Sequence, residues 1–108
     1  FLMPSLYEPC GLNQMYSLKY GTVPVVRETG GLADSVVQID AGNSSGTGVL
    51  FRDYDASGLA WAVNRGLDLY AKPKLWPKLV ANGMAQDFSW ERQGAIYVDH
   101  YHRLSGQA

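Results

Sequence analysis

The sequence predicts an α/β fold in which a parallel sheet carries helices on its flanks. Short apolar segments of strand type, at residues 1–3, 23–26 and 49–51, alternate with segments whose apolar residues recur at the helical period. Parallel strands need crossover connections of about a dozen residues, which such helices provide. With 108 residues and 46% hydrophobic content, the chain suits one compact domain.

The first quarter predicts a strand, a loop, a helix and a second strand. Residues 1–3 form the strand, and two prolines within residues 4–9 prevent a regular ladder there. Apolar residues at helical spacing predict a helix over about residues 12–20, which Gly21 ends. The β-branched run at 23–26 predicts the second strand.

The middle of the chain predicts a turn, two strands and a loop. Residues 29–32 contain a glycine pair and predict the turn. Residues 35–39 predict one strand, and residues 49–51 predict the other. Between the two strands, the Gly/Ser-rich residues 41–48 predict a flexible loop.

The last half is predicted to be helical. Asp55 can cap a helix, residues 75–84 predict a shorter one, and Ser89 can cap a final helix with Glu91 in its first turn. The apolar stripe of the first helix is Leu59, Val63, Leu67 and Tyr70, and that of the last is Trp90, Tyr97, Tyr101 and Leu104.

Composition argues against several classes of partner. Nine Lys and Arg residues against ten Asp and Glu residues leave no basic field for nucleic acid or anionic lipid. No apolar run approaches the roughly 20 residues of a membrane-spanning helix. Cys10 is the single cysteine, which favours a reducing compartment, and we expect a cytoplasmic protein. His100 and His102 diverge on a helix, so no metal site is expected.

The chain opens with Phe1 inside an apolar run rather than with methionine. This pattern is typical of a chain cut within an element. We therefore expect residues 1–108 to be a single partial domain of a longer protein, with a partial function.

The loop before the first helix is the candidate ligand site. In parallel sheets, ligands bind beyond the carboxyl ends of the strands, often where a loop feeds a helix N-terminus. Gly11 lets the backbone approach a phosphate closely, and Glu8 could accept hydrogen bonds from sugar hydroxyls. A structural cap or a solvated charge would give the same pattern, so the residues alone leave both interpretations open.

Five runs of sequence carry a family resemblance. The run PSLYEPCGLNQ at residues 4–14 is similar to the glutamate-containing signature of bacterial glycogen synthases and plant starch synthases. Landmarks of the same family's C-terminal domain follow in order: KYGTVP at 19–24, TGGLAD at 29–34, GVLF at 48–51 and DFSW at 87–90. The resemblance spans nearly the whole chain.

The resemblance implies a two-domain fold of the GT-B type, with two Rossmann-like halves facing a cleft. This chain would be the later part of the C-terminal, donor-binding half, and the N-terminal half is absent from it. Family members are hexosyltransferases that move glucose from ADP-glucose to the nonreducing end of an α-1,4-glucan, with retention and without a cofactor or metal. The chain by itself is therefore expected to be inactive.

The resemblance also assigns roles within the loop. Glu8 would be the catalytic residue and would contact the transferred glucose. The donor-binding set would be Glu8, Cys10, Gly11, Leu12 and Asn13, the last at the phosphate end. Two positions depart from the family pattern: Leu6 replaces a frequent arginine, and Tyr16 stands where many GT-B enzymes have a ribose-contacting glutamate.

Other interpretations remain. A different GT-B transferase or a phosphorylase could use the same loop, although no suitable pyridoxal phosphate lysine motif is found. A stand-alone nucleotide-sugar or glucan-binding module without catalysis is the alternative from another class. Trp61, Trp76 and Trp90 could be sugar-stacking platforms, but core or domain-interface packing is the preferred interpretation.

Overall fold

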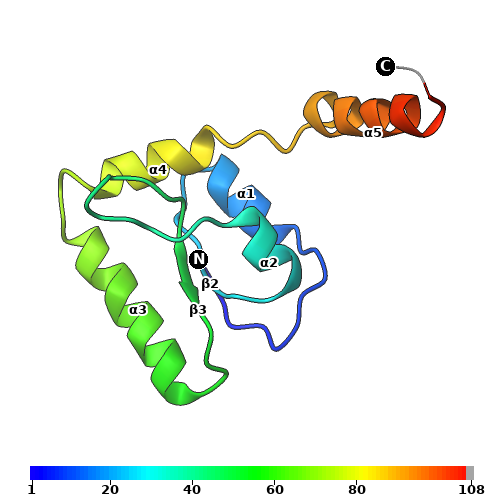
Figure 1. Ribbon diagram of the computed structural model, residues 1–108. Coiled ribbons are helices and arrows are strands. Elements are labelled where there is room, and N and C mark those ends of the chain that lie inside the picture. Colours follow the sequence, from blue (N-terminus) through cyan, green and yellow to red (C-terminus); the bar gives the residue numbers. More distant parts are fainter. Residues whose placement is uncertain (107–108) are drawn as a thin grey trace.

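The computed structural model describes residues 1–106 and contains a three-stranded parallel sheet (Figure 1). The strands are β1 (Leu2–Met3), β2 (Val25–Arg27) and β3 (Val49–Phe51), and they lie in that order across the sheet. The predicted α/β class is confirmed, and so are the strands predicted at residues 1–3, 23–26 and 49–51.

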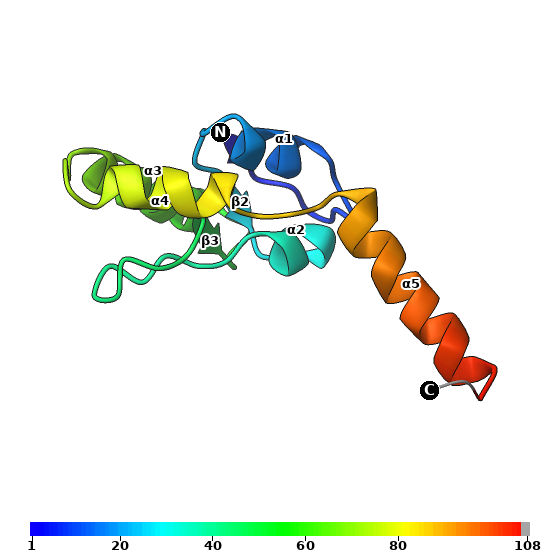
Figure 2. The same ribbon diagram turned by 90° about the horizontal axis from the view of Figure 1, so that it is seen from above.

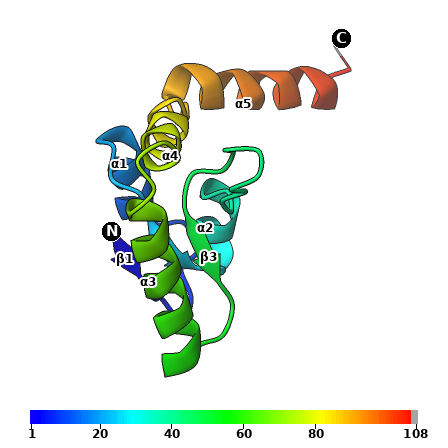
Figure 3. The same ribbon diagram turned by 90° about the vertical axis from the view of Figure 1, so that its left-hand side faces the viewer.

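Side chains on the two faces of the sheet alternate, as the strand period requires. Val49 and Phe51 pack with α3 (Ala56–Tyr70), whereas Val26 and Leu50 pack with α2 (Gly30–Ser35). Figure 1 shows α3 and α2 on opposite sides of β3, and Figure 3 views the molecule from the side of α3. The short sheet is thus covered by a helix on each face, and each face has its own apolar cluster.

Two more helices complete the packed body. Helix α1 (Asn13–Lys19) lies against α4 (Trp76–Met84) and also contacts α2. Gly83 permits the close approach of α1 to α4, because a Cβ there would lie 2.9 Å from Cδ2 of the buried Leu18. Trp76 meets Tyr70 edge to face, with ring centroids 5.1 Å apart.

Helix α5 (Trp90–Leu104) projects away from this body (Figure 2). Ser89 caps it as predicted, since its Oγ accepts a hydrogen bond from the Arg92 N–H at 3.4 Å. None of its residues is buried. No helix within residues 1–106 has the length and apolar character needed to cross a membrane.

Two predicted elements are wrong. The turn at residues 29–32 is instead the start of α2, whose first residue, Gly30, has a φ of 47°. The strand at residues 35–39 does not form; only a single bridge joins Gln38 to Gly48. At Leu50 the backbone of β3 does not pair with this segment. Its N–H and carbonyl instead form hydrogen bonds with the Gln38 side-chain carboxamide.

The apolar stripe predicted for α3 also differs from its buried face. Gly58, Ala62 and Leu69 are buried, whereas Val63 and Leu67 are exposed. Gly58 and Ala62 let α3 approach the sheet closely, Leu69 and the partly buried Leu59 pack in the core, and Val63 and Leu67 lie beside the contact.

Candidate functional site

The candidate site is the loop of residues 4–12, which leaves the carboxyl end of β1 and leads into α1. The neighbouring strand β2 ends at the same edge of the sheet and leads into α2. The two connections touch, because the Gly31 N–H donates a hydrogen bond to the Glu8 carbonyl at 2.8 Å. Residues far apart in the sequence therefore build one surface at this edge.

Glu8 presents a free carboxylate on this surface. Its side chain is partly exposed, and within residues 1–106 no hydrogen bond or ion pair engages its carboxylate oxygens. The backbone of Glu8 is held while its acidic group is not. A structural cap, which was one interpretation of the sequence, is therefore not its role here.

The glycine pair Gly30-Gly31 packs directly on the Glu8 loop. A Cβ on Gly31 would lie 2.5 Å from Cα of Cys10, and a Cβ on Gly30 would lie 2.9 Å from the Glu8 carbonyl carbon. Both distances are shorter than real Cβ contacts, so no side chain fits at either position without moving the loop. The pair therefore supports the loop rather than forming a separate turn.

Gln14 fastens the loop from beneath. Its side chain is fully buried, and its Nε2 donates to the carbonyl oxygens of Cys10 (2.8 Å) and Gly11 (3.1 Å) and to Oγ of Ser35 (3.1 Å). Ser35 in turn donates to the Gly31 carbonyl at 2.6 Å. A chain of hydrogen bonds thus joins both connections through the Nε2 of one buried amide, whereas the Oε1 of the same amide is buried without a hydrogen-bond partner within residues 1–106.

Arg27 braces the start of the loop from the carboxyl end of β2. Its Nη1 donates to the Leu6 carbonyl at 2.6 Å, and its Nε donates to the Arg52 carbonyl at 3.1 Å. The guanidinium also lies 5.3 Å from the ring centroid of Tyr54, within cation–π range. One side chain therefore ties together the segments that follow β1 and β3.

The remaining predicted donor-binding residues lie where the loop becomes helix. Gly11 has a φ of 74°, a conformation that favours glycine. Cys10, Leu12 and Asn13 are exposed, and no side chain within residues 1–106 caps the start of α1. The structure thus brings all five predicted residues onto one exposed turn.

Sequence reasoning missed the bracing residues. Gln14, Arg27 and Ser35 received no role, although Gln14 occurs within the signature run. Gln14 lies four residues before the buried Leu18, and this spacing places both residues on one helix face. The spacing was therefore the available signal that Gln14 is buried.

Tyr16 is exposed on α1 beside the loop. Within residues 1–106 no group of three His, Cys, Asp or Glu side chains could hold a metal ion.

Curated relatives match the chain over nearly its whole length. Glycogen synthase from Thermosipho melanesiensis is 55% identical over 104 residues, covering 95% of this chain and 22% of the relative. Glycogen synthase from Thioalkalivibrio sulfidiphilus is 54% identical over 107 residues, covering 96% of this chain and 22% of the relative. The chain thus spans about a fifth of the length of these relatives. No protein-family model matches it.

Two solved structures share its fold. The catalytic domain of starch synthase IV from Arabidopsis thaliana, bound to ADP and acarbose, is 38% identical with a TM-score of 0.84, over 95% of this chain and 22% of that one. Sucrose-phosphate synthase from Thermosynechococcus elongatus is 30% identical with a TM-score of 0.68, over 97% of this chain and 25% of that one. The predicted resemblance to glycogen and starch synthases and the GT-B type of fold are confirmed.

Proposed function

We propose that this chain is part of the donor-binding half of a retaining glucosyltransferase, which transfers glucose from ADP-glucose to the nonreducing end of an α-1,4-glucan. The observation that carries the proposal is the likeness to the starch synthase IV catalytic domain, which was solved with ADP and acarbose bound. That likeness includes the sequence as well as the fold, at 38% identity over 95% of this chain.

We propose further that a longer parent protein supplies the other half of the enzyme. The chain spans about a fifth of its curated relatives. The outer edge of β1 pairs with no strand within residues 1–106, and Phe1 and Leu2 beside it are exposed. Unpaired edges and contiguous apolar surface are usually covered in native proteins, which supports additional structure on this side.

In the proposed enzyme, Glu8 contacts the transferred glucose. Its unengaged carboxylate can accept hydrogen bonds from sugar hydroxyls. Its negative charge also favours the positive charge that develops on the sugar ring as the diphosphate departs. Backbone groups of Cys10, Gly11 and Leu12 approach the sugar and diphosphate, and Asn13 lies at the phosphate end.

The contacts that hold the loop backbone support the proposed catalytic role of Glu8. Electrostatic stabilisation is strongest when the groups are oriented before the reaction begins. Gly31, Gln14 and Arg27 hold the loop backbone from three sides. The loop backbone that carries Glu8 therefore needs little reorganisation when the donor binds.

Glucose transfer by the full-length parent protein tests the proposal. Labelled ADP-glucose and UDP-glucose are supplied with glycogen, and incorporation is compared among the parent, Glu8→Ala and Glu91→Ala. Glu91 is the control because it is an exposed glutamate on α5 that belongs neither to the predicted donor-binding residues nor to the residues that line the hollow beside the loop. We expect transfer from ADP-glucose that falls about 10²–10³-fold or more in Glu8→Ala and stays unchanged in Glu91→Ala.

Failure of transfer from both donors by a well-folded parent would overturn the proposal and favour a binding module without catalysis. A second variant tests the bracing separately. Gly31→Ala forces Cys10 and the loop that contains it away from α2, so we expect weaker use of ADP-glucose while the fold, monitored by circular dichroism, persists.

A further inference from the structure

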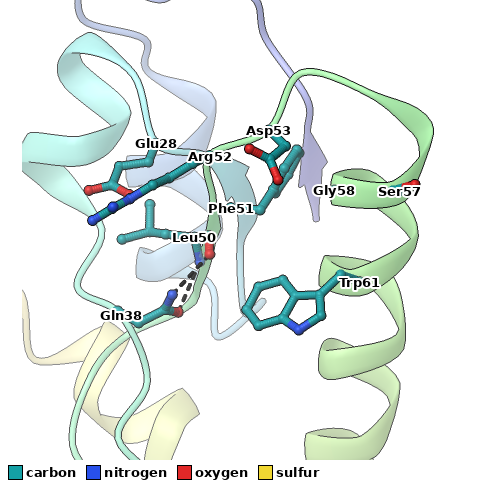
Figure 4. Close-up of a pocket in the computed structure, with 9 residues that line it drawn as sticks. All are labelled: Glu28, Gln38, Leu50, Phe51, Arg52, Asp53, Ser57, Gly58 and Trp61. Atoms are coloured by element: carbon teal, nitrogen blue, oxygen red, sulfur yellow. Dashed lines mark hydrogen bonds and ion pairs between the residues drawn. The ribbon is translucent and has the colours of Figure 1, made fainter.

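A second hollow lies along β3 and its carboxyl end, and none of the predicted donor-binding residues lines it (Figure 4). Its volume is about 610 Å³, which is within the range of small-molecule sites. Helix α3 forms one wall, and residues next to β2 and β3 together with Gln38 form the other. Phe51, which is buried in β3, also lines the hollow.

Trp61 of α3 forms the aromatic wall of this hollow. Its indole stands across the hollow from Gln38 in Figure 4, and the residue is 51% exposed. Trp61 therefore does not lie in the core within residues 1–106, and the domain-interface packing that the sequence also favoured stays a prediction. A large aromatic ring with one open side, beside polar groups, is typical of a surface that binds a partly apolar ligand.

The opposite wall carries planar polar groups, of which the Gln38 carboxamide is held by two hydrogen bonds and the Arg52 guanidinium by one. The Gln38 Nε2 donates to the Leu50 carbonyl at 2.9 Å, and the Gln38 Oε1 accepts from the Leu50 N–H at 3.0 Å. The Arg52 guanidinium donates to Glu28 through Nε at 2.8 Å. Each group keeps further hydrogen-bonding capacity for a ligand, because carboxamides, carboxylates and guanidinium groups each form several hydrogen bonds.

The charge in the hollow points to a neutral ligand. Glu28 and Arg52 neutralise one another, and Asp53 adds a single negative charge. A phosphate would meet two carboxylates and one guanidinium. Hydroxyl groups can both donate to the carboxylates and accept from Gln38 and Arg52, and the apolar face of a pyranose ring can lie on the indole.

We propose that this hollow is a carbohydrate-binding subsite that takes a stretch of glucan chain, apart from the Glu8 loop. The choice of glucan as the carbohydrate rests on the proposed function, whereas the sugar-binding chemistry rests on the hollow itself. Holding a polymeric acceptor at a second place raises its effective concentration near the transfer site.

The test compares the full-length parent with Trp61→Ala, Arg52→Gln and Tyr20→Ala. Tyr20 is the matched control, an aromatic residue that is exposed and lies outside the hollow. Retention on immobilised glycogen and binding of maltoheptaose are measured without donor, and transfer from ADP-glucose to maltotriose is measured separately. We expect Trp61→Ala to weaken glycogen retention about tenfold, Arg52→Gln to weaken it less, and Tyr20→Ala to leave it unchanged.

Transfer to maltotriose should stay at the parent's level in all three variants, because none of them changes a predicted donor-binding residue. Unchanged glycogen retention in both Trp61→Ala and Arg52→Gln overturns the subsite. If the parent transfers no glucose but its retention on glycogen still depends on Trp61, the subsite is supported and the proposed activity is overturned. The two proposals therefore fail in distinguishable ways.

Discussion

Helices α3 and α5 have the same length and similar starts but opposite surroundings. Each has 15 residues, and each begins behind a side chain that caps it, Asp55 for α3 and Ser89 for α5. Helix α3 lies on β2 and β3 and buries Gly58, Ala62 and Leu69, whereas α5 buries nothing. Local sequence thus specifies a helix in both places, but only a packing partner turns its apolar residues into a core.

The interactions of α5 are correspondingly local. Its ion pair joins Arg103 to Asp99 one turn away at 2.9 Å, and both side chains are exposed. Such pairs contribute only about 0.3–0.5 kcal/mol. Most of the stability of helices in proteins comes from packing an apolar face, and α3 has this contribution where α5 lacks it.

The largest expected difference between the helices comes from truncating one leucine in each. Leu69 of α3 is 0% exposed, and Leu104 of α5 is 86% exposed. Leu69→Ala should lower the free energy of unfolding of the chain by about 2–5 kcal/mol, because it removes buried methyl groups and leaves a cavity. Leu104→Ala should change it by less than about 0.5 kcal/mol. Urea unfolding followed by circular dichroism measures both values, and equal losses would show that α5 is packed in solution.

Removing the two caps should give a smaller contrast. The Asp55 carboxylate accepts from the Gly58 N–H at 2.7 Å, so Asp55→Ala should destabilise the folded body by about 1 kcal/mol. Ser89→Ala removes a longer bond, and it should unravel only the first turn of α5. Urea unfolding measures the first effect and backbone amide chemical shifts measure the second. A lower unfolding midpoint in Ser89→Ala would contradict the separation of α5 from the body.

Much of the fold could be predicted from the sequence, because local signals and tertiary packing agree there. Residues 49–51 are all apolar and include the β-branched Val49 and the aromatic Phe51. All three are buried in β3. Residues 35–39 carry a similar pattern, yet Val36 packs in the α2 cluster while the Gln38 side chain occupies the edge of β3. A side chain that replaces a strand at a sheet edge leaves no periodic signal.

The candidate site was predictable in part for the same reason. Glu8 and Gly11 lie in a contiguous run that ends at a helix, so their proximity is local. The contacts of Gly31 and Arg27 with that run join residues more than 20 positions apart in the sequence. Trp61 could not be placed either, since an apolar residue on a helix predicts burial only where a partner covers it.

Gly94 offers a change that should act on α5 alone. A Cβ at this position would meet nothing within 4 Å, and glycine within a helix is less favourable than alanine by about 1 kcal/mol. Gly94→Ala should therefore raise the helicity of α5 and leave the unfolding midpoint of the body unchanged. Gly58→Ala is the matched change in α3, where a Cβ would lie 3.2 Å from the Asp53 carbonyl carbon and should destabilise. Stabilisation by both variants would remove the distinction between the helices.

The smallest effect concerns the pH response at the start of α5. Hydrogen bonds from the Ser89 hydroxyl and then from its N–H, the latter at 2.9 Å, lower the pKa of Asp87 from its ordinary value of 3.8. Because the pKa of Asp87 is lower in the folded chain, the stabilisation from its carboxylate is fully present above the pKa of the unfolded chain. This stabilisation is lost as the pH falls through the pKa of the folded chain. The first turn of α5 should therefore loosen on acidification below that ordinary value, which an NMR titration of the Ser89 amide would record. Asp87→Asn should flatten this response while leaving signals of α3 unaffected, because the carboxylate acts on the exposed helix and not on the packed body.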